Sequence, residues 1–190
     1  YVIWMVPGIV PWFYFSEALN SGTNCLQEYH YLVKKVVFQV EMLPIIKLIS
    51  CFMVHACFLA IMVGFYLVGG YFPIATWIQV LYYSFAVSML ALAVTYITSS
   101  IQVFFKDMAQ IVGICLQFGM WLTPIMYHES MFTDAHPWLL PIFKLNPFYY
   151  ISTGFRDSML QGNWFFERPT LTLYFWAVTL VRSEEHTSEL

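Results

Sequence analysis

The feature that most constrains the fold is the length of the apolar runs in this sequence. Residues 45–68 are almost entirely apolar, and comparable runs cover residues 1–19 and 76–97. About 20 apolar residues in an α-helix cross the hydrocarbon core of a bilayer, which is about 30 Å thick. A shorter run covers residues 108–127, and residues 170–181 begin another helix. We therefore predict four membrane spans and the start of a fifth.

Composition identifies lipid as the main solvent of this chain. Hydrophobic residues make up 60% of the sequence, charged residues make up 10%, and the mean hydropathy is +0.67. These values are typical of an integral membrane protein. In hydrocarbon every backbone N–H and C=O must be paired within the protein, and the runs lack the short alternating pattern of barrel strands. The predicted fold class is therefore all-α, a polytopic bundle of membrane helices.

Both ends of the sequence are expected to be truncated. The chain is apolar from Tyr1, with neither an initiator Met nor the basic start of a signal peptide. At the other end, residues 182–190 read RSEEHTSEL and change the composition abruptly within a helical pattern. They resemble the translated start of a short-read sequencing adapter, and the alternative is a charged cytoplasmic tail. We exclude them from the fold prediction.

Local charge predicts the orientation of the spans. The link between the second and third spans, residues 69–73, has no Lys or Arg, whereas Lys34 and Lys35 precede the second span and Lys106 follows the third. The positive-inside rule places these lysines in the cytoplasm and the link outside. Residues 128–169 then lie outside as well, although three basic side chains there weaken the signal.

The connection between the first two spans, residues 20–44, is longer than a tight turn requires. Apolar side chains recur in it at helical spacing. Interspersed with them are the charged residues Glu28, Lys34, Lys35 and Glu41. This pattern is typical of an amphipathic segment at the membrane interface. The alternative is a solvated loop whose lysines only fix the orientation.

Four stretches of sequence carry a family resemblance. They are PWFYFSEALNSGTN, LVKKVVFQVEMLP, KDMAQIVGICLQFGMWLTPIMY and KLNPFYYISTGFRDSMLQG. In this order they resemble ABC-2 type permeases of the polysaccharide, O-antigen and teichoic-acid export group. The resemblance covers residues 1–181 and implies a six-helix permease subunit, of the type V exporter kind, that here lacks its first helix and most of its sixth. One departure is Gln39, where the family often carries proline, so that Pro44 alone would bend the chain into the next helix.

The resemblance implies roles for two segments. Residues 20–44 would form the coupling helix that docks on an ATPase subunit, and residues 128–169 would form an external gate. The coupling residues would be Glu28, Lys34, Lys35 and Glu41. The gate residues would be Asn146, Pro147, Arg156 and Asp157. The alternative for the outer segment is a surface loop that rests on the outer leaflet.

Arg156 and Asp157 are adjacent in the sequence, and neighbouring residues on a helix do not face each other. Each is therefore expected to find a separate partner. The planar fork of the guanidinium suits a carboxylate or a phosphate. We expect Arg156 to hold the closed gate through a charge-assisted contact.

Aromatic residues could line a passage for sugars, as the polysaccharide substrates of the resembling family imply. The candidates are Tyr82, Tyr83, Trp121 and Tyr127. The alternative is an aromatic belt at the membrane interface, where Tyr and Trp are enriched.

The sequence contains no motif for covalent chemistry. It has no G-x-x-x-x-G-K-[ST] phosphate loop, so ATP and magnesium are expected on a partner subunit and no cofactor on this chain. Its four cysteines form no C-x-x-C pair, and its histidines have no metal-binding spacing, so we expect no metal site. His55 falls near mid-membrane, where we expect a neutral imidazole bonded to a neighbouring helix.

These observations predict a transport permease rather than an enzyme. The expected protein is a homodimer in the bacterial cytoplasmic membrane that binds an ABC ATPase, has no nucleic-acid partner and exports a lipid-linked glycan. The first alternative is an ABC-2 permease for drugs or lipids. A membrane-embedded glycosyltransferase would need acidic or histidine clusters in loops at the membrane edge, and a passive channel would have no use for a long docking segment.

Overall fold

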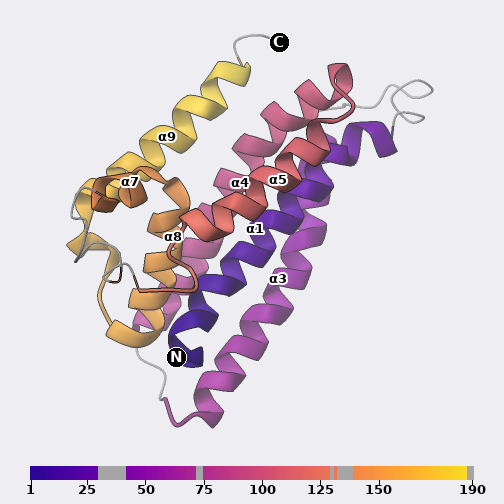
Figure 1. The fold of residues 1–190 in the computed structure, drawn as a ribbon. Coiled ribbons are helices and arrows are strands. Elements are labelled where there is room, and N and C mark those ends of the chain that lie inside the picture. Colours follow the sequence, from indigo (N-terminus) through magenta and orange to yellow (C-terminus); the bar gives the residue numbers. More distant parts are fainter. Residues whose placement is uncertain (30–41, 72–74, 129–130, 132–138, 188–190) are drawn as a thin grey trace.

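The computed structural model describes residues 1–29, 42–71, 75–128, 131 and 139–187. Every regular element in these residues is a helix (Figure 1). The long helices are α1 (Val2–Glu28), α3 (Met42–Val68), α4 (Gln79–Phe104), α5 (Met108–Leu122) and α9 (Pro169–Thr187). The short ones are η1 (Ala75–Ile78), α7 (Leu139–Leu145), α8 (Pro147–Arg156), the π-helical η2 (Asp157–Gln161) and η3 (Phe165–Glu167).

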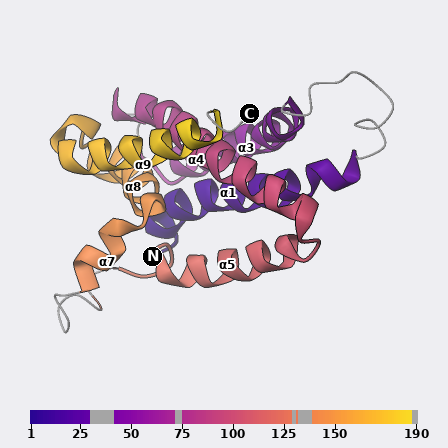
Figure 2. The same cartoon turned by 90° about the horizontal axis from the view of Figure 1, so that it is seen from above.

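Within the described ranges, three helices are long and apolar enough to cross a membrane. They are Val2–Glu28, Met42–Val68 and the continuous stretch Ala75–Phe104, and α5 is a shorter apolar helix. The predicted all-α membrane fold is confirmed. Helix α1 is central, since it packs against α3, α4, α5 and α8. Seen from above in Figure 2, α1 lies between α5 on one side and the layer of α3, α4 and α9 on the other.

The two ends of the bundle can be told apart by their basic residues. Helices α1 and α4 run parallel, because Tyr14 bonds Ser88 near their middles and Gln27 bonds the Gln102 carbonyl near their ends. We call the end where α1 ends and α3 begins, with Lys47 and the α4–α5 turn, the lysine end. We call the opposite end, where Arg156 and Arg168 lie, the arginine end.

Two prolines lie inside α1, and the fold compensates for one of them directly. Pro7 has no N–H, so the carbonyl of Ile3 one turn earlier loses its helical donor. The hydroxyl of Tyr66 on α3 donates to this carbonyl at 2.5 Å. A freed carbonyl inside a membrane must find such a partner within the protein. This bond therefore ties the start of α1 to the end of α3.

Small residues let α1 and α4 approach closely. A Cβ placed on Gly22 would lie 2.3 Å from the side chain of Thr95, so only glycine fits there. One residue later, the hydroxyls of Thr23 and Thr98 are 2.8 Å apart, and both side chains are buried. Small side chains and hydroxyl contacts of this kind are typical of packed helices in membranes.

Some helices differ in extent from the apolar runs. Helix α1 continues past residue 19 to Glu28, so its last turns consist largely of polar residues. Helix α5 ends at Leu122, short of residue 127. The reason is Pro124, since the residue before a proline favours an extended backbone and Thr123 adopts one. Helix α3 includes Pro44 in its first turn, where a missing N–H costs nothing.

Helix α8 runs along the first half of α1 in the opposite direction. Phe148 near its start packs edge-on against Trp12 at 4.8 Å, and Arg156 at its end lies over Trp4. Trp12 is about 15 Å from the start of α1 at 1.5 Å per residue. The outer segment therefore contains a helix, α8, that is too short to span the membrane.

Candidate functional site

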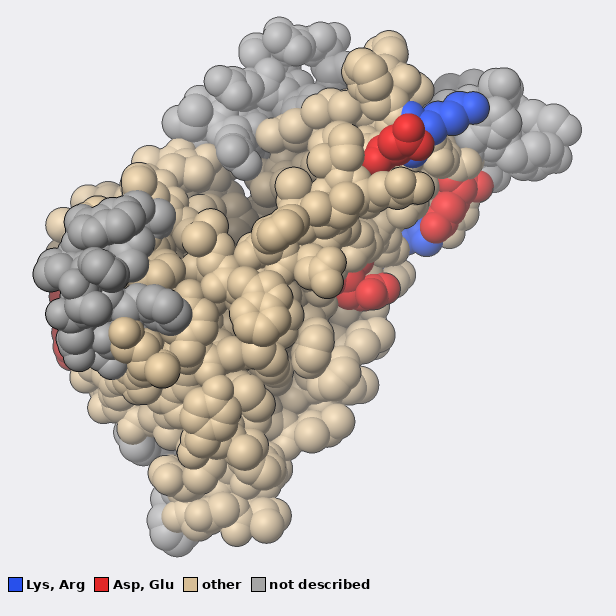
Figure 3. Space-filling view, viewed as in Figure 1, with Lys and Arg blue, Asp and Glu red and all other residues tan. Residues whose placement is uncertain are grey.

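The lysine end carries the described part of the predicted coupling site. Glu28, the last residue of α1, accepts a hydrogen bond from Lys47 Nζ at 2.6 Å. The pair is accessible, with side-chain exposures of 50% for Glu28 and 21% for Lys47. The other predicted coupling residues, Lys34, Lys35 and Glu41, lie outside the described residues. On the face in Figure 3, charged atoms gather towards this end and most of the remaining surface is uncharged.

Buried Gln102 fixes the α4–α5 turn at the same end. Its side-chain amide donates to the carbonyl of Lys106 at 3.0 Å, and its side-chain oxygen accepts from the backbone N–H of Ala109 at 2.8 Å. Both ends of one amide are therefore used to join the end of α4 to the start of α5. The turn is built as a rigid part of the lysine end.

Asn146 and Pro147, two of the predicted gate residues, begin α8. The side-chain oxygen of Asn146 accepts from the backbone N–H of Phe148 at 3.0 Å, and Pro147 occupies the first helical position. Both choices are favourable at a helix start. The Asn146 amide also donates to Thr123 Oγ1 at 2.7 Å. The pair thus attaches the start of α8 to the segment that follows α5.

Arg156 joins α8 to two other parts of the chain. Its Nη2 donates to the carbonyl of Ile125 at 2.7 Å, and its Nε lies 3.4 Å from the carbonyl of Trp4. The guanidinium also stacks over the Trp4 ring, 3.6 Å from its centroid. Arg156 is buried, with 6% of the residue exposed, and a buried charge is costly unless it is paired or hydrogen-bonded. Arg156 satisfies a carbonyl in the irregular segment after α5.

Asp157 pairs with Arg168, whose Nη2 lies 3.4 Å from the aspartate Oδ2. Arg168 lies just before α9, so this contact joins the end of α8 to the start of α9. Among the contacts with described residues, Arg156 meets Trp4 and Ile125, whereas Asp157 meets Arg168. Arg156 also binds carbonyl oxygens, whereas a carboxylate or a phosphate was the expected partner.

The four predicted channel aromatics do not come together. Tyr83 is 4% exposed and packs against Tyr150 and against Gly154 of α8. Tyr82 stacks on Phe165 and accepts a hydrogen bond from Trp176 Nε1 at 2.8 Å. These tyrosines form part of the packed core between α4, α8 and α9.

The other two channel candidates lie beyond this core. Trp121, near the end of α5, is 68% exposed. The hydroxyl of Tyr127 donates to the Trp121 backbone carbonyl at 2.9 Å. The exposed position of Trp121 at the end of α5 suits the aromatic-belt alternative.

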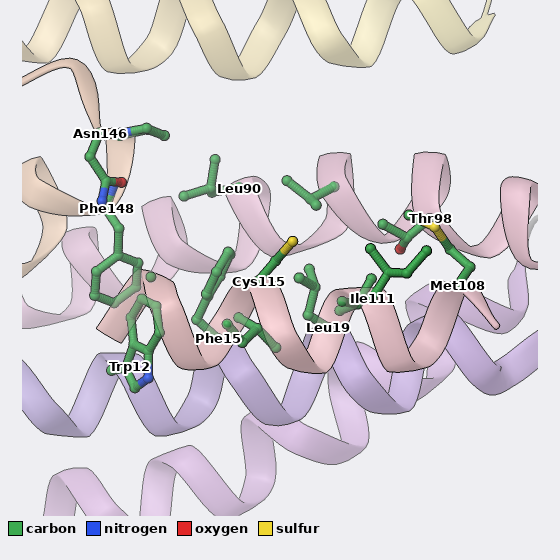
Figure 4. A pocket seen from close by; sticks show the side chains of 15 residues that line it. Trp12, Phe15, Leu19, Leu90, Thr98, Met108, Ile111, Cys115, Asn146 and Phe148 are labelled. Carbon is green, nitrogen blue, oxygen red and sulfur yellow. The ribbon is translucent and has the colours of Figure 1, made fainter. Parts of the chain in front are cut away.

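An apolar cavity of about 320 Å³ lies between α1, α4, α5 and the start of α8. Figure 4 shows Trp12, Phe15 and Leu19 of α1 facing Cys115 and Ile111 of α5. Asn146 stands at one end of the cavity and Thr98 towards the other (Figure 4). The described lining includes none of the predicted channel aromatics. Its chemistry suits a hydrocarbon chain better than a sugar.

His55 bonds a neighbouring helix, as expected for it. Its Nε2 lies 3.2 Å from Ser84 Oγ on α4, and its ring stacks on Tyr14 of α1 at 4.6 Å. The side chain is 1% exposed and so connects three helices from within the core. Within the described residues, no group of His, Cys, Asp and Glu side chains could hold a metal ion.

Trp4, Ile125 and His128, which lie around Arg156, were not identified from the sequence. The ring of His128 stacks on the ring of Trp4, with 4.5 Å between their centroids. Trp4 and Arg156 are 152 residues apart in the sequence. A tryptophan in an apolar run predicts a membrane helix, but nothing local identifies the distant arginine that it meets.

Comparison with curated proteins gives three matches that cover most of the chain. An O-antigen export system permease protein RfbA of Klebsiella pneumoniae is 24% identical over 184 residues, which are 95% of this chain and 68% of that protein. The protein of the same name from Myxococcus xanthus is 28% identical, over 93% of this chain and 68% of its own length.

A second Klebsiella pneumoniae RfbA is 22% identical, over 85% of this chain and 62% of its own length. No family model matches the chain. The helices, the motifs and the three matches agree, and the chain is related to the permeases of O-antigen export systems, the ABC-2 group that its sequence resembles.

Proposed function

We propose that this chain is the permease subunit of an ATP-driven exporter of lipid-linked polysaccharide. The cargo would be of the O-antigen, capsule or teichoic-acid type, and the membrane would be the bacterial cytoplasmic membrane. The observation that carries the proposal is the match to three O-antigen export permeases over 85% to 95% of the chain. The membrane-length helices support it, because a permease must cross the bilayer.

The energy source would be a separate ATPase subunit that binds ATP and magnesium. The sequence supports this division, because it contains no phosphate-binding loop. The ATPase would dock at the lysine end, where the exposed Glu28–Lys47 pair and the Gln102-braced turn lie. Two permease copies and two ATPase copies would form the complex in the bilayer, with no nucleic acid.

The external gate would be α8 with its flanking segments. Arg156 supports this assignment, because it joins α8 to α1 and to the segment after α5. Packed elements can switch between two discrete arrangements when the directed contacts between them break and re-form. Opening the gate would require Arg156 to leave the carbonyl of Ile125.

A complementation experiment tests the proposal. The full-length gene is expressed together with its ATPase gene in a strain whose own O-antigen export permease has been deleted. Surface O-antigen is measured by immunolabelling of intact cells, and a variant ATPase that cannot hydrolyse ATP is the control. The proposal is supported if surface O-antigen is restored with the active ATPase and is not restored with the inactive variant. Intracellular accumulation despite correct membrane insertion contradicts it, and drug or lipid efflux by the same cells would favour the alternative permease.

A further inference from the structure

One face of α1 changes character along its length. From Ser16 onward the face carries the polar residues Ser16, Glu17, Asn20, Asn24, Gln27 and Glu28. These positions repeat every three or four residues and so lie on one side of the helix. Nearer the start of α1, the same face carries Val2, Val6, Ile9 and Phe13. The face is therefore apolar towards the arginine end and polar towards the lysine end.

This polar face is only partly covered by the rest of the described chain, through the bonds of Gln27 to Gln102 and of Glu28 to Lys47. Glu17 is exposed, and Asn20 and Asn24 are only partly buried. By contrast, the sides of α1 that meet α3 and α4 are closed, as Tyr14 and Thr23 are 4% and 0% exposed. The amide of Asn24 donates to the carbonyl of Asn20 on its own helix at 3.0 Å. The face is therefore most open at Glu17 and, near the end of α1, at Gln27 and Glu28.

The depth of Glu17 follows from its neighbours on α3. Tyr14, three residues earlier, contacts both Phe52 and His55. Glu28, at the end of α1, pairs with Lys47. Since the two helices are antiparallel, Glu17 lies about level with Phe52, near the middle of Met42–Val68. At 1.5 Å per residue it is about 16 Å from Glu28 along the helix axis.

At the same depth, the open face of α3 is apolar. Met53 is 67% exposed, and Ile49 and Val54 are 59% and 54% exposed. Such a face is suited to lipid. A charged side chain near the centre of a bilayer costs about 3 kcal/mol in insertion measurements, so it faces water or another polar group. Two neighbouring helices thus present opposite chemistry at one depth, and the face of α1 does not suit lipid.

We propose that Glu17, Asn20 and Asn24 line a water-filled vestibule that opens at the lysine end and reaches the middle of the membrane. Phe13, 48% exposed on the same face, begins the apolar part that closes it. Amide and carboxylate groups bind hydroxyl-rich solutes by hydrogen bonds, so the vestibule would receive the glycan part of the cargo. The cargo rests on the proposed export function, whereas access to water does not.

Cysteine labelling tests the vestibule directly. In the full-length protein with its native cysteines replaced by alanine, Glu17→Cys, Asn20→Cys and Asn24→Cys are compared with Met53→Cys. Inside-out membrane vesicles are treated with a charged methanethiosulfonate reagent. The reactive thiolate forms only in water, so the three vestibule cysteines should react on the order of tenfold or more faster than Met53→Cys. Met53 is the matched control, because it is exposed at the same depth on α3.

Labelling of Glu17→Cys as slow as that of Met53→Cys would overturn the proposal. A disulfide between the Glu17→Cys residues of two copies, formed in place of labelling, would also overturn it, because this face would then be a helix interface. Labelling requires no transport. Slow labelling therefore refutes the vestibule, whereas fast labelling without O-antigen export in the complementation test refutes only the cargo.

Discussion

The lysine end and the arginine end use charged side chains in opposite ways. At the lysine end, Glu28 and Lys47 meet at the surface, with half of the Glu28 side chain exposed. At the arginine end, Arg156 and Asp157 are 6% and 7% exposed and contact a ring, carbonyl oxygens and another arginine. Exposed pairs contribute little to stability, whereas a buried charge is costly to strip of its partners. One end is therefore suited to reversible contact and the other to holding helices together.

Replacement of Arg156 should have the largest effect on stability. Arg156→Ala removes the bonds to carbonyl oxygens and the stacking on Trp4, and should cost about 3 kcal/mol. Arg156→Lys keeps the charge but loses the planar fork, so its effect should be smaller. Thermal unfolding of the full-length protein in nanodiscs measures the loss, and export at matched surface expression measures the gate.

Lys144→Ala is the control for this series, because Lys144 is an exposed cation of the same outer segment. It should leave both unfolding and export unchanged. An Arg156→Ala variant with normal stability, normal export and no added leak would reduce Arg156 to an interfacial anchor.

Gly154→Ala should have an intermediate effect. An added Cβ would lie 2.2 Å from the ring of Tyr83, which is buried and cannot move away freely. Overpacking of this kind should cost about 2 kcal/mol. Gly113→Ala on α5 is the matched control, since its Cβ would meet nothing within 4 Å. Equal unfolding temperatures for the two variants would show that α8 does not pack on α4 as described.

The smallest effect is expected from Glu28→Gln at the lysine end. The variant keeps the length of the side chain and loses the ion pair with Lys47. Because both groups are accessible, unfolding should change by about 0.5 kcal/mol or less, and the difference should shrink as salt is added. A loss as large as that of Arg156→Ala would remove the contrast between the two ends.

The sequence predicts the membrane helices better than it predicts their ends and contacts. Apolar runs locate α1, α3 and α4, because lipid requires long apolar helices. The end of α5 was predicted at residue 127 because the sequence stays apolar up to there. The helix instead ends at Leu122, before Pro124. The role of Asn146 and Pro147 at a helix start follows from local chemistry.

Tertiary contacts were less accessible to prediction. Nothing local in the sequence links Arg156 to Trp4, because the two residues are 152 positions apart. The same holds for the four aromatic residues named as possible channel contributors, since Tyr83 is 4% exposed and Trp121 is 68% exposed. Aromatic residues in different spans look alike in the sequence, whereas their burial depends on which helices they meet.

We expect the lysine end to be the contact with the ATPase. The most direct test is the double variant Lys34→Glu/Lys35→Glu in the full-length protein reconstituted with its ATPase. Because these residues are expected outside the hydrocarbon, insertion and unfolding should be unchanged, while transport and substrate-coupled ATP hydrolysis should both fall sharply. Normal coupling in a correctly inserted double variant would contradict the claim.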